Sequence, residues 1–176
     1  NISNINGKNV LVWGRHKAMR KVGMTNANWQ DVYIVAKWEG GTNFSTFSGL
    51  FTGTVDRDED IGLIGDSNTM NLYPNNWWNK VYVNGFNKSG IGILIDMYEP
   101  FFTSFNKSSS LSAFGFVIGQ DRNYNDRGWE GLIAEVLAFN NLLPDDNRQK
   151  IEGYLAHKWG LAANLPADHP YKSNAP

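Results

Sequence analysis

The chain has 176 residues, of which 41% are hydrophobic and 14% are aromatic, so it can bury a sizeable core and is not expected to be disordered. Its formal net charge of −1 excludes a protein that tracks nucleic-acid phosphates with a densely basic surface. The absence of cysteine excludes disulfides, thiolate catalysis and thiolate zinc sites.

No apolar run reaches the roughly 20 residues needed to span a bilayer, and no secretory leader is recognisable. No internal repeat or linker divides the chain. We therefore expect residues 1–176 to form a single domain with no membrane insertion. That domain is either a mature protein or one module of a larger surface or virion protein.

Short stretches of alternating apolar and polar residues, separated by turns rich in Gly, Asn and Asp, dominate the chain up to Phe139. In Asp31–Trp38, for example, Val32 and Ile34 point to one face and Tyr33 to the other. This pattern predicts strands at Asn9–Trp13, Asp31–Trp38, Thr46–Thr52, Ile61–Ile64, Lys80–Val83, Ile91–Met97, Phe114–Gln120 and Gly131–Phe139. Many short strands with a buried face predict an all-β protein, a two-sheet antiparallel jelly-roll sandwich.

One α-helix is predicted after the last strand, over Asp145–Trp159. We expect it to pack across one end or edge of the sandwich through an apolar face formed by Ile151, Tyr154, Leu155 and Trp159. Gly160 suits the left-handed position that ends a helix. Gly153 costs about 1 kcal/mol relative to alanine, and a close approach of the helix to the sheet is the expected reason.

The C-terminal part of the chain, roughly its last fifty residues, also carries a family resemblance. Trp129–Leu143, Arg148–Leu161 and Leu165–Tyr171 closely resemble the C-terminal block of laminin-G-like (LamG-like jelly-roll) domains. These are the bacterial and phage-type members of the concanavalin A-like lectin/glucanase superfamily. Pro144 departs from the Ser or Thr that related sequences carry as a helix cap. The resemblance implies a jelly roll found in adhesins, virion proteins and polysaccharide-acting enzymes, and so fixes no single activity.

The acidic residues do not match the catalytic pattern of that superfamily. Its retaining glycanases carry Glu-x-Asp-x-x-Glu on one strand, which brings the carboxylates together. Here Glu130 and Glu135 lie five positions apart, on opposite strand faces, with no Asp between them. The histidines His16, His157 and His169 are scattered along the chain. We predict that the protein is not an enzyme, and a degenerate glycanase is kept as the weakest alternative.

Two acidic loops have spacings that suit a hard cation. Carboxylates or amides at alternate positions can wrap their oxygens around calcium. The residues are Asp56, Asp58 and Asp60 in the first loop and Asp121, Asn123 and Asn125 in the second. Both loops lack the glycine and the bidentate glutamate of a complete calcium loop, so a solvated turn is the alternative. Calcium in at least one loop is a hypothesis.

Aromatic rings in an asparagine-rich setting supply a second signal. Trp77 and Trp78 would face opposite sides of a strand, so at least one ring is expected to be exposed, unless both pack over a sandwich end. Lectins stack sugar CH groups on such rings and bond the hydroxyls with neighbouring polar groups. The candidate ligand-binding residues are Tyr73, Asn76, Trp77, Trp78, Asn79 and Tyr124. Trp38, Trp129 and Trp159 are expected in the core.

Two function classes follow. The first is a non-catalytic, lectin-like adhesion module that binds glycans of a cell surface or a polysaccharide, with calcium as an aid. The second is a structural or assembly module, such as a phage capsid decoration or a tail-associated protein, with other subunits as partners. An apolar patch would favour the second class, and Phe101, Phe102 and Phe105 are the candidate patch. Either class predicts an extracellular, cell-surface or virion location, with no nucleic-acid partner.

Overall fold

The computed structural model describes residues 1–25, 29–40, 47–55, 63–66, 71–73, 79–88, 93–107 and 115–176. The described strands are β1 (Ile2–Ile5), β2 (Lys8–Trp13), β3 (Met19–Val22), β4 (Asp31–Trp38), β5 (Ser48–Thr52), β6 (Leu63–Asp66), β7 (Asn71–Tyr73), β8 (Lys80–Val83), β9 (Phe86–Asn87), β10 (Ile93–Leu94), β11 (Phe101–Asn106), β12 (Gly115–Ile118) and β13 (Gly131–Phe139). They are followed by α1 (Asp145–Lys158) and a short 3₁₀ turn (Ala162–Asn164). The prediction of a mostly β chain that ends in one α-helix is therefore confirmed.

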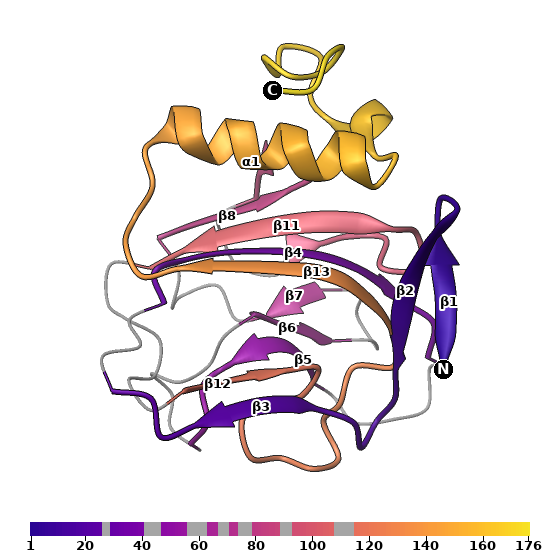
Figure 1. Cartoon of the computed structure of the whole chain (residues 1–176), viewed down its shortest axis with the longest axis vertical. Coiled ribbons are helices and arrows are strands. Elements are labelled where there is room, and N and C mark those ends of the chain that lie inside the picture. The colour runs from indigo at the N-terminus through magenta and orange to yellow at the C-terminus, as the bar shows by residue number, and fades with distance from the viewer. Residues whose placement is uncertain are drawn as a thin grey trace.

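The strands form two antiparallel sheets that lie face to face (Figure 1). Sheet A has seven strands in the order β1-β2-β13-β4-β11-β8-β9, and sheet B has six in the order β10-β7-β6-β5-β12-β3. The strands predicted at Asp31–Trp38, Lys80–Val83 and Gly131–Phe139 are confirmed at the same bounds. Of the strand predicted at Ile91–Met97, the described residues 93–97 form a strand at Ile93 and Leu94, where β10 pairs with β7, and no strand from Ile95 on.

A hydrophobic core fills the space between the sheets. From sheet A, the inward-facing residues of β4 include Ile34 and Trp38, and from sheet B, Leu50 and Phe51 meet them. Trp38 and Trp129 are 1% and 0% exposed and pack edge to face with ring centroids 4.9 Å apart, so both are core residues as predicted. Together these contacts make the two sheets one packed unit.

Helix α1 lies across the outer face of sheet A, above β8, β11, β4 and β13 (Figure 1). The predicted position at an end or edge of the sheets is therefore wrong. The physical reason is that β4 is apolar on both faces: Tyr33 and Val35 point outward, are fully buried, and pack with Leu155 of the helix. Trp159 is 5% exposed in the same cluster, as predicted. A sheet with two apolar faces needs a second covering layer, which the helix supplies.

The buried side of α1 is partly charged, which the apolar pattern did not predict. Tyr154, expected to be inward, is 41% exposed, whereas Glu152 is fully buried. The Glu152 carboxylate accepts hydrogen bonds from Arg148 at 2.6 Å and from the Ser104 hydroxyl of β11 at 3.3 Å. His169 Nε2 lies 3.3 Å from the same carboxylate. These bonds attach the helix to sheet A and to the C-terminal segment.

Gly153 meets the C-terminal tail and not the sheet, so the expected reason for this glycine was wrong. A Cβ at position 153 would lie 2.5 Å from Cβ of Tyr171. His157 Nε2 lies 2.8 Å from the Tyr171 carbonyl oxygen and holds the tail in this place. Gly160 has φ +69°, the left-handed conformation predicted for the residue that ends the helix.

The proposed phenylalanine patch does not exist, because the structure buries all three rings. Phe101, Phe102 and Phe105 are 2%, 0% and 1% exposed. They belong to β11, a strand in the interior of sheet A. Phe101 and Phe105 point into the core between the sheets, and Phe102 points toward the helix layer. A strand covered on both faces can place consecutive apolar residues inward.

Candidate functional site

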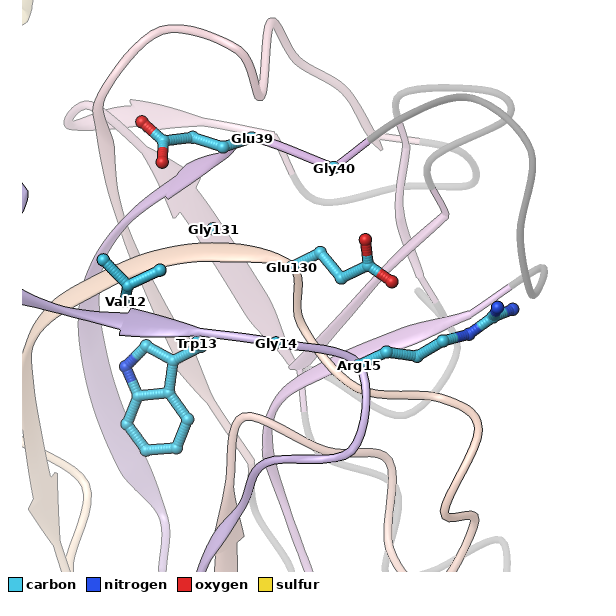
Figure 2. A pocket seen from close by; sticks show the side chains of 8 residues that line it. All are labelled: Val12, Trp13, Gly14, Arg15, Glu39, Gly40, Glu130 and Gly131. Atoms are coloured by element: carbon cyan, nitrogen blue, oxygen red, sulfur yellow. The ribbon is translucent and has the colours of Figure 1, made fainter. Parts of the chain in front are cut away.

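An open cavity of about 450 Å³ lies where β2 and β4 end and β13 begins (Figure 2). We call it the rim cavity. These strands are neighbours in sheet A, so three distant parts of the sequence meet here. The cavity is lined by Val12, Trp13, Gly14, Arg15, Glu39, Gly40, Glu130 and Gly131.

Backbone hydrogen bonds fix the two glutamates of the rim cavity beside each other. The Glu130 carbonyl accepts the N–H groups of Glu39 at 2.9 Å and Gly40 at 3.0 Å. In the next ladder position, Gly131 pairs with Trp38 of β4 and with Trp13 of β2. The start of β13 therefore lies between the ends of β4 and β2, and this position places Glu130 at the mouth of the cavity.

Glycine is required at two positions of this junction. A Cβ at Gly40 would lie 2.5 Å from the Trp38 ring and 2.8 Å from Cβ of Glu130. Gly131 has φ +151°, and a Cβ there would lie 2.2 Å from the Lys37 carbonyl oxygen. Both contacts are too short for any side chain, so the two glycines let β13 and β4 approach closely and leave the cavity floor as bare backbone.

The side chains around the rim cavity are mostly polar and differ in how they are held. Glu39 forms a 3.3 Å ion pair with Lys37, and in Figure 2 its carboxylate turns away from Glu130. The half-buried Glu130 carboxylate turns toward the side on which Arg15 lies. Across the described part of the chain, the Glu130 side chain has no hydrogen-bond partner. Its two oxygens can therefore accept hydrogen bonds from a ligand.

The connection between β12 and β13 supports the Arg15 side of the cavity. Arg15 Nε donates to the Asp126 carbonyl at 3.3 Å, and His16 Nδ1 lies 2.8 Å from the Asn125 carbonyl. Because a carbonyl only accepts, that imidazole nitrogen carries the proton. Only glycine fits at position 128, where a Cβ would lie 2.0 Å from the Arg15 carbonyl oxygen. The end of β2 is thus fixed in place.

The same connection contains the second predicted calcium loop. Asp121 is fully buried and accepts bonds from two guanidinium groups, Arg122 Nε at 2.7 Å and Arg127 Nη1 at 3.1 Å. Asn123 Oδ1 accepts from Arg20 at 3.3 Å, and Asn125 Oδ1 accepts from Gln120 at 3.2 Å; both distances are near the upper limit for a hydrogen bond. In this arrangement the oxygens face protein donors, several of them cationic, and do not fit a calcium ion.

The candidate ligand-binding residues within the described ranges do not come together. Asn79 is exposed just before β8, at the end of sheet A where β4 begins, and its N–H bonds the Asn106 carbonyl. Tyr124 lies in the connection before β13, whose first residue pairs with Trp38 at the opposite end of β4. Its ring lies 3.9 Å from the Arg127 guanidinium carbon. Tyr73 ends β7 in sheet B.

Other predicted site residues fall outside the described ranges, and their roles stay predictions: Asp56, Asp58, Asp60, Asn76, Trp77 and Trp78. Within those ranges, no three metal-ligating side chains gather in one place. None of the helices described here is both long and apolar enough to cross a membrane.

Sequence reasoning missed the residues of the rim cavity. In the sequence, Glu130 is considered only together with Glu135, and no functional role is assigned to Glu39, which follows the strand predicted at Asp31–Trp38. The signal available in the sequence was the repeated Glu-Gly step, Glu39-Gly40 after one apolar strand and Glu130-Gly131 before another. Pairing those two steps requires the order of strands in sheet A, which local patterns do not contain.

Comparison of the chain with protein-family models, curated proteins and solved structures finds no match. The function is therefore inferred from the geometry of the rim cavity and from the residues around it.

Proposed function

We propose that this chain is a non-catalytic carbohydrate-binding module with a jelly-roll fold, and that a sugar binds in the rim cavity. The observation that carries the proposal is a half-buried carboxylate, Glu130, at the mouth of a cavity of about 450 Å³, with its hydrogen-bonding capacity unused among the described residues. Cavities that bind small molecules have volumes of roughly 300–1,000 Å³.

The composition of the rim cavity suits a sugar. A carboxylate accepts hydrogen bonds from two adjacent hydroxyls, and the Arg15 guanidinium, although already engaged elsewhere, adds donors. Val12 supplies apolar surface for the CH groups of a sugar, whereas the Trp13 ring turns away from Glu130 (Figure 2). The glycine floor admits the ligand close to the backbone. The resemblance to LamG-like domains agrees with a glycan as partner and with a surface or virion setting.

Calcium belongs to the proposal only as an aid held by the loop at residues 56–60. A second candidate function is that of an assembly module. It is favoured by exposed apolar side chains at the β1–β2 edge of sheet A, where Ile2 is 71% and Leu11 is 54% exposed.

A glycan array tests the proposal, probed in calcium and again in EDTA with the full chain and with Glu130→Gln. We expect binding by the full chain and a loss of about tenfold or more in Glu130→Gln, since a hydrogen bond to a charged group contributes about 1.5–3 kcal/mol. Binding that disappears in EDTA assigns a role to calcium. Absence of binding in both conditions rejects the carbohydrate proposal and favours the assembly module.

A further inference from the structure

The inner face of sheet A is left uncovered at one edge. Five residues stand in register across the sheet: Phe101, Ala36, Ile133, Leu11 and Ile2. Their exposed fractions are 2%, 0%, 5%, 54% and 71% in that order. The increase toward the edge shows that sheet B ends before it reaches β2 and β1, so an apolar row that points inward lies in solvent.

Strand β3 is the edge of sheet B on this side, and among the described strands it pairs only with β12. Met19 of β3 is 50% exposed and stands opposite Ile118 in the ladder. Two adjoining cavities of about 350 and 210 Å³ lie between β3 and sheet A, and both are lined by Trp13 and Met19. We call this region the edge groove; it is formed by Leu11, Trp13, Met19, Ile118 and Ile133.

The border of the edge groove is cationic. Lys17 lines the groove, and Lys17, Arg20 and Lys21 are all exposed. Arg20 donates to neutral acceptors, the Gln120 side chain at 2.9 Å and the Arg122 carbonyl at 3.1 Å. In the described ranges none of the three cations has a carboxylate partner. The charge of this border is therefore uncompensated there, and it complements an anionic partner.

Glu135, an acidic residue that also lines the groove, does not neutralise the positive charge of its border. Glu135 lines the smaller cavity, but its carboxylate accepts bonds from Lys158 at 3.0 Å and from the Trp159 indole at 2.6 Å. Both donors belong to the helix layer on the other face of sheet A. The groove thus combines an uncovered apolar floor, a strand with an unpaired edge among the described strands, and positive charge.

We propose that the edge groove binds an extended segment of a partner protein in which apolar and acidic residues alternate, as an additional strand beside β3. Such strand addition uses main-chain hydrogen bonds for affinity and alternate side chains for specificity. Successive side chains of a strand point to opposite sides, so one set covers Leu11 and Met19, with Lys17 and Lys21 at the border on that side, while the other set lies beside Arg20. The proposal does not depend on carbohydrate binding at the rim cavity.

A second copy of this chain does not fit the groove as well. If β3 paired with β3 of another copy, Arg20 and Lys21 would meet the same cations across the interface. Positive side chains on an edge strand oppose such self-association. The charge pattern therefore selects an acidic partner segment.

The test uses the full chain and a synthetic peptide of about ten residues, alternating Ile and Glu, the length of a long strand. Binding is followed by fluorescence anisotropy, and amide hydrogen exchange is measured at β3. We expect saturable binding, slower exchange at Met19–Val22, and at least tenfold weaker binding by Leu11→Asp. If Leu11→Asp does not fold, Met19→Asp takes its place.

The matched control is Phe86→Asp, which changes a side chain 47% exposed on β9, the opposite edge of sheet A. It is expected to bind as the unchanged chain does. The double variant Lys17→Glu and Lys21→Glu is expected to prefer a peptide that alternates Ile and Lys. The proposal is overturned by a probe that does not bind, by equal weakening in Phe86→Asp, or by unchanged exchange at β3. It is also overturned if the unchanged chain is a dimer in solution and Leu11→Asp makes it a monomer. Binding of an acidic polysaccharide in the groove, with no binding of the peptide, would overturn it as well.

Discussion

Beneath helix α1 the charged side chains bond to one another, whereas at the rim cavity and along the edge groove charged groups lie open to solvent. Glu152 is fully buried and has three partners within 3.3 Å. Glu130 is half-buried and its side chain has none among the described residues. The two carboxylates come from neighbouring parts of the sequence, yet one stabilises the fold and the other is available to a ligand.

Burial alone therefore does not mark a functional site in this chain. The most buried polar cluster holds a helix on a sheet, and its hydrogen bonds are satisfied internally. The rim cavity is less buried but is built around unused hydrogen-bonding capacity. Each of the following variants changes one side of this comparison, in order of the expected effect on stability.

The largest effect is expected from Glu152→Ala. It leaves the Arg148 guanidinium and the Ser104 hydroxyl buried without their shared acceptor. Removal of one partner from a buried ion pair lowers the free energy of unfolding by about 3–5 kcal/mol. Chemical denaturation measures the loss. The double variant Arg148→Met and Glu152→Leu should lose less, because no uncompensated charge stays buried. Equal losses in the single and the double variant would contradict a paired cluster.

The next effect concerns Asp31, whose carboxylate accepts the Leu143 N–H under the helix layer. Burial raises the pKa of this carboxyl from 3.8 to about 6. The folded chain then holds the proton more tightly than the unfolded chain, so this group's contribution to the free energy of unfolding falls as pH rises from about 4 to about 6. Asp31→Asn, which has no such charge to bury, should be about 2–3 kcal/mol more stable than the unchanged chain at pH 7.

The measurement for Asp31→Asn is urea denaturation of both proteins between pH 4 and pH 7. The advantage of the variant should shrink toward zero near pH 4, where the buried carboxyl of the unchanged chain is protonated. A difference that is the same at every pH would show that the carboxyl does not titrate in this window.

A smaller effect is expected from Gly153→Ala. Alanine improves helix propensity by about 1 kcal/mol, but its Cβ would lie 2.5 Å from Cβ of Tyr171. Such overpacking costs about 1–3 kcal/mol, so the net result is a loss of up to about 2 kcal/mol. In the background Tyr171→Gly the same substitution should become stabilising, which thermal melts can measure. If Gly153→Ala lowered the stability equally in the Tyr171→Gly background, contact with Tyr171 would not be the reason why alanine is unfavourable at position 153.

The smallest effect on stability is expected from Glu130→Gln, within about 0.5 kcal/mol of the unchanged chain, because its side chain has no partner to lose in the described part. Glycan binding should nevertheless fall. A matched control is Glu135→Gln, whose carboxylate accepts bonds from Lys158 and Trp159. That control should lose stability and keep binding. If Glu130→Gln lost stability and kept glycan binding, while Glu135→Gln kept stability and lost binding, Glu130 would be a structural residue and not a ligand-binding one.

The sequence predicts the β-rich frame well where alternation is local. Asp31–Trp38 and Gly131–Phe139 are confirmed as strands at their predicted bounds, and the helix begins at Asp145 as expected. β11 was missed because in its sequence, FFTSFN, apolar and polar residues do not alternate. The helix face was misjudged because Glu152 is inward in an ion pair, and hydrophobic periodicity ignores paired charges.

The rim cavity was beyond sequence reasoning for a different physical reason. Trp13, Glu39 and Glu130 are far apart along the chain and meet only because β13 pairs with both β2 and β4. That order is decided by the packing of whole strands and not by any local pattern. The Asp121 loop shows the converse: the spacing suited a cation, but Arg122 and Arg127 occupy its oxygens in the folded chain.

The most direct test of the central claim is an NMR titration of the ¹⁵N-labelled full chain with a glycan selected from the array. Sugar bound in the rim cavity should shift the amide signals of Gly14, Gly40 and Gly131, and Glu130→Gln should abolish these shifts while the rest of the spectrum is kept. Shifts confined to other parts of the chain, with the three glycine signals unmoved, would contradict the assignment of the rim cavity as the carbohydrate site.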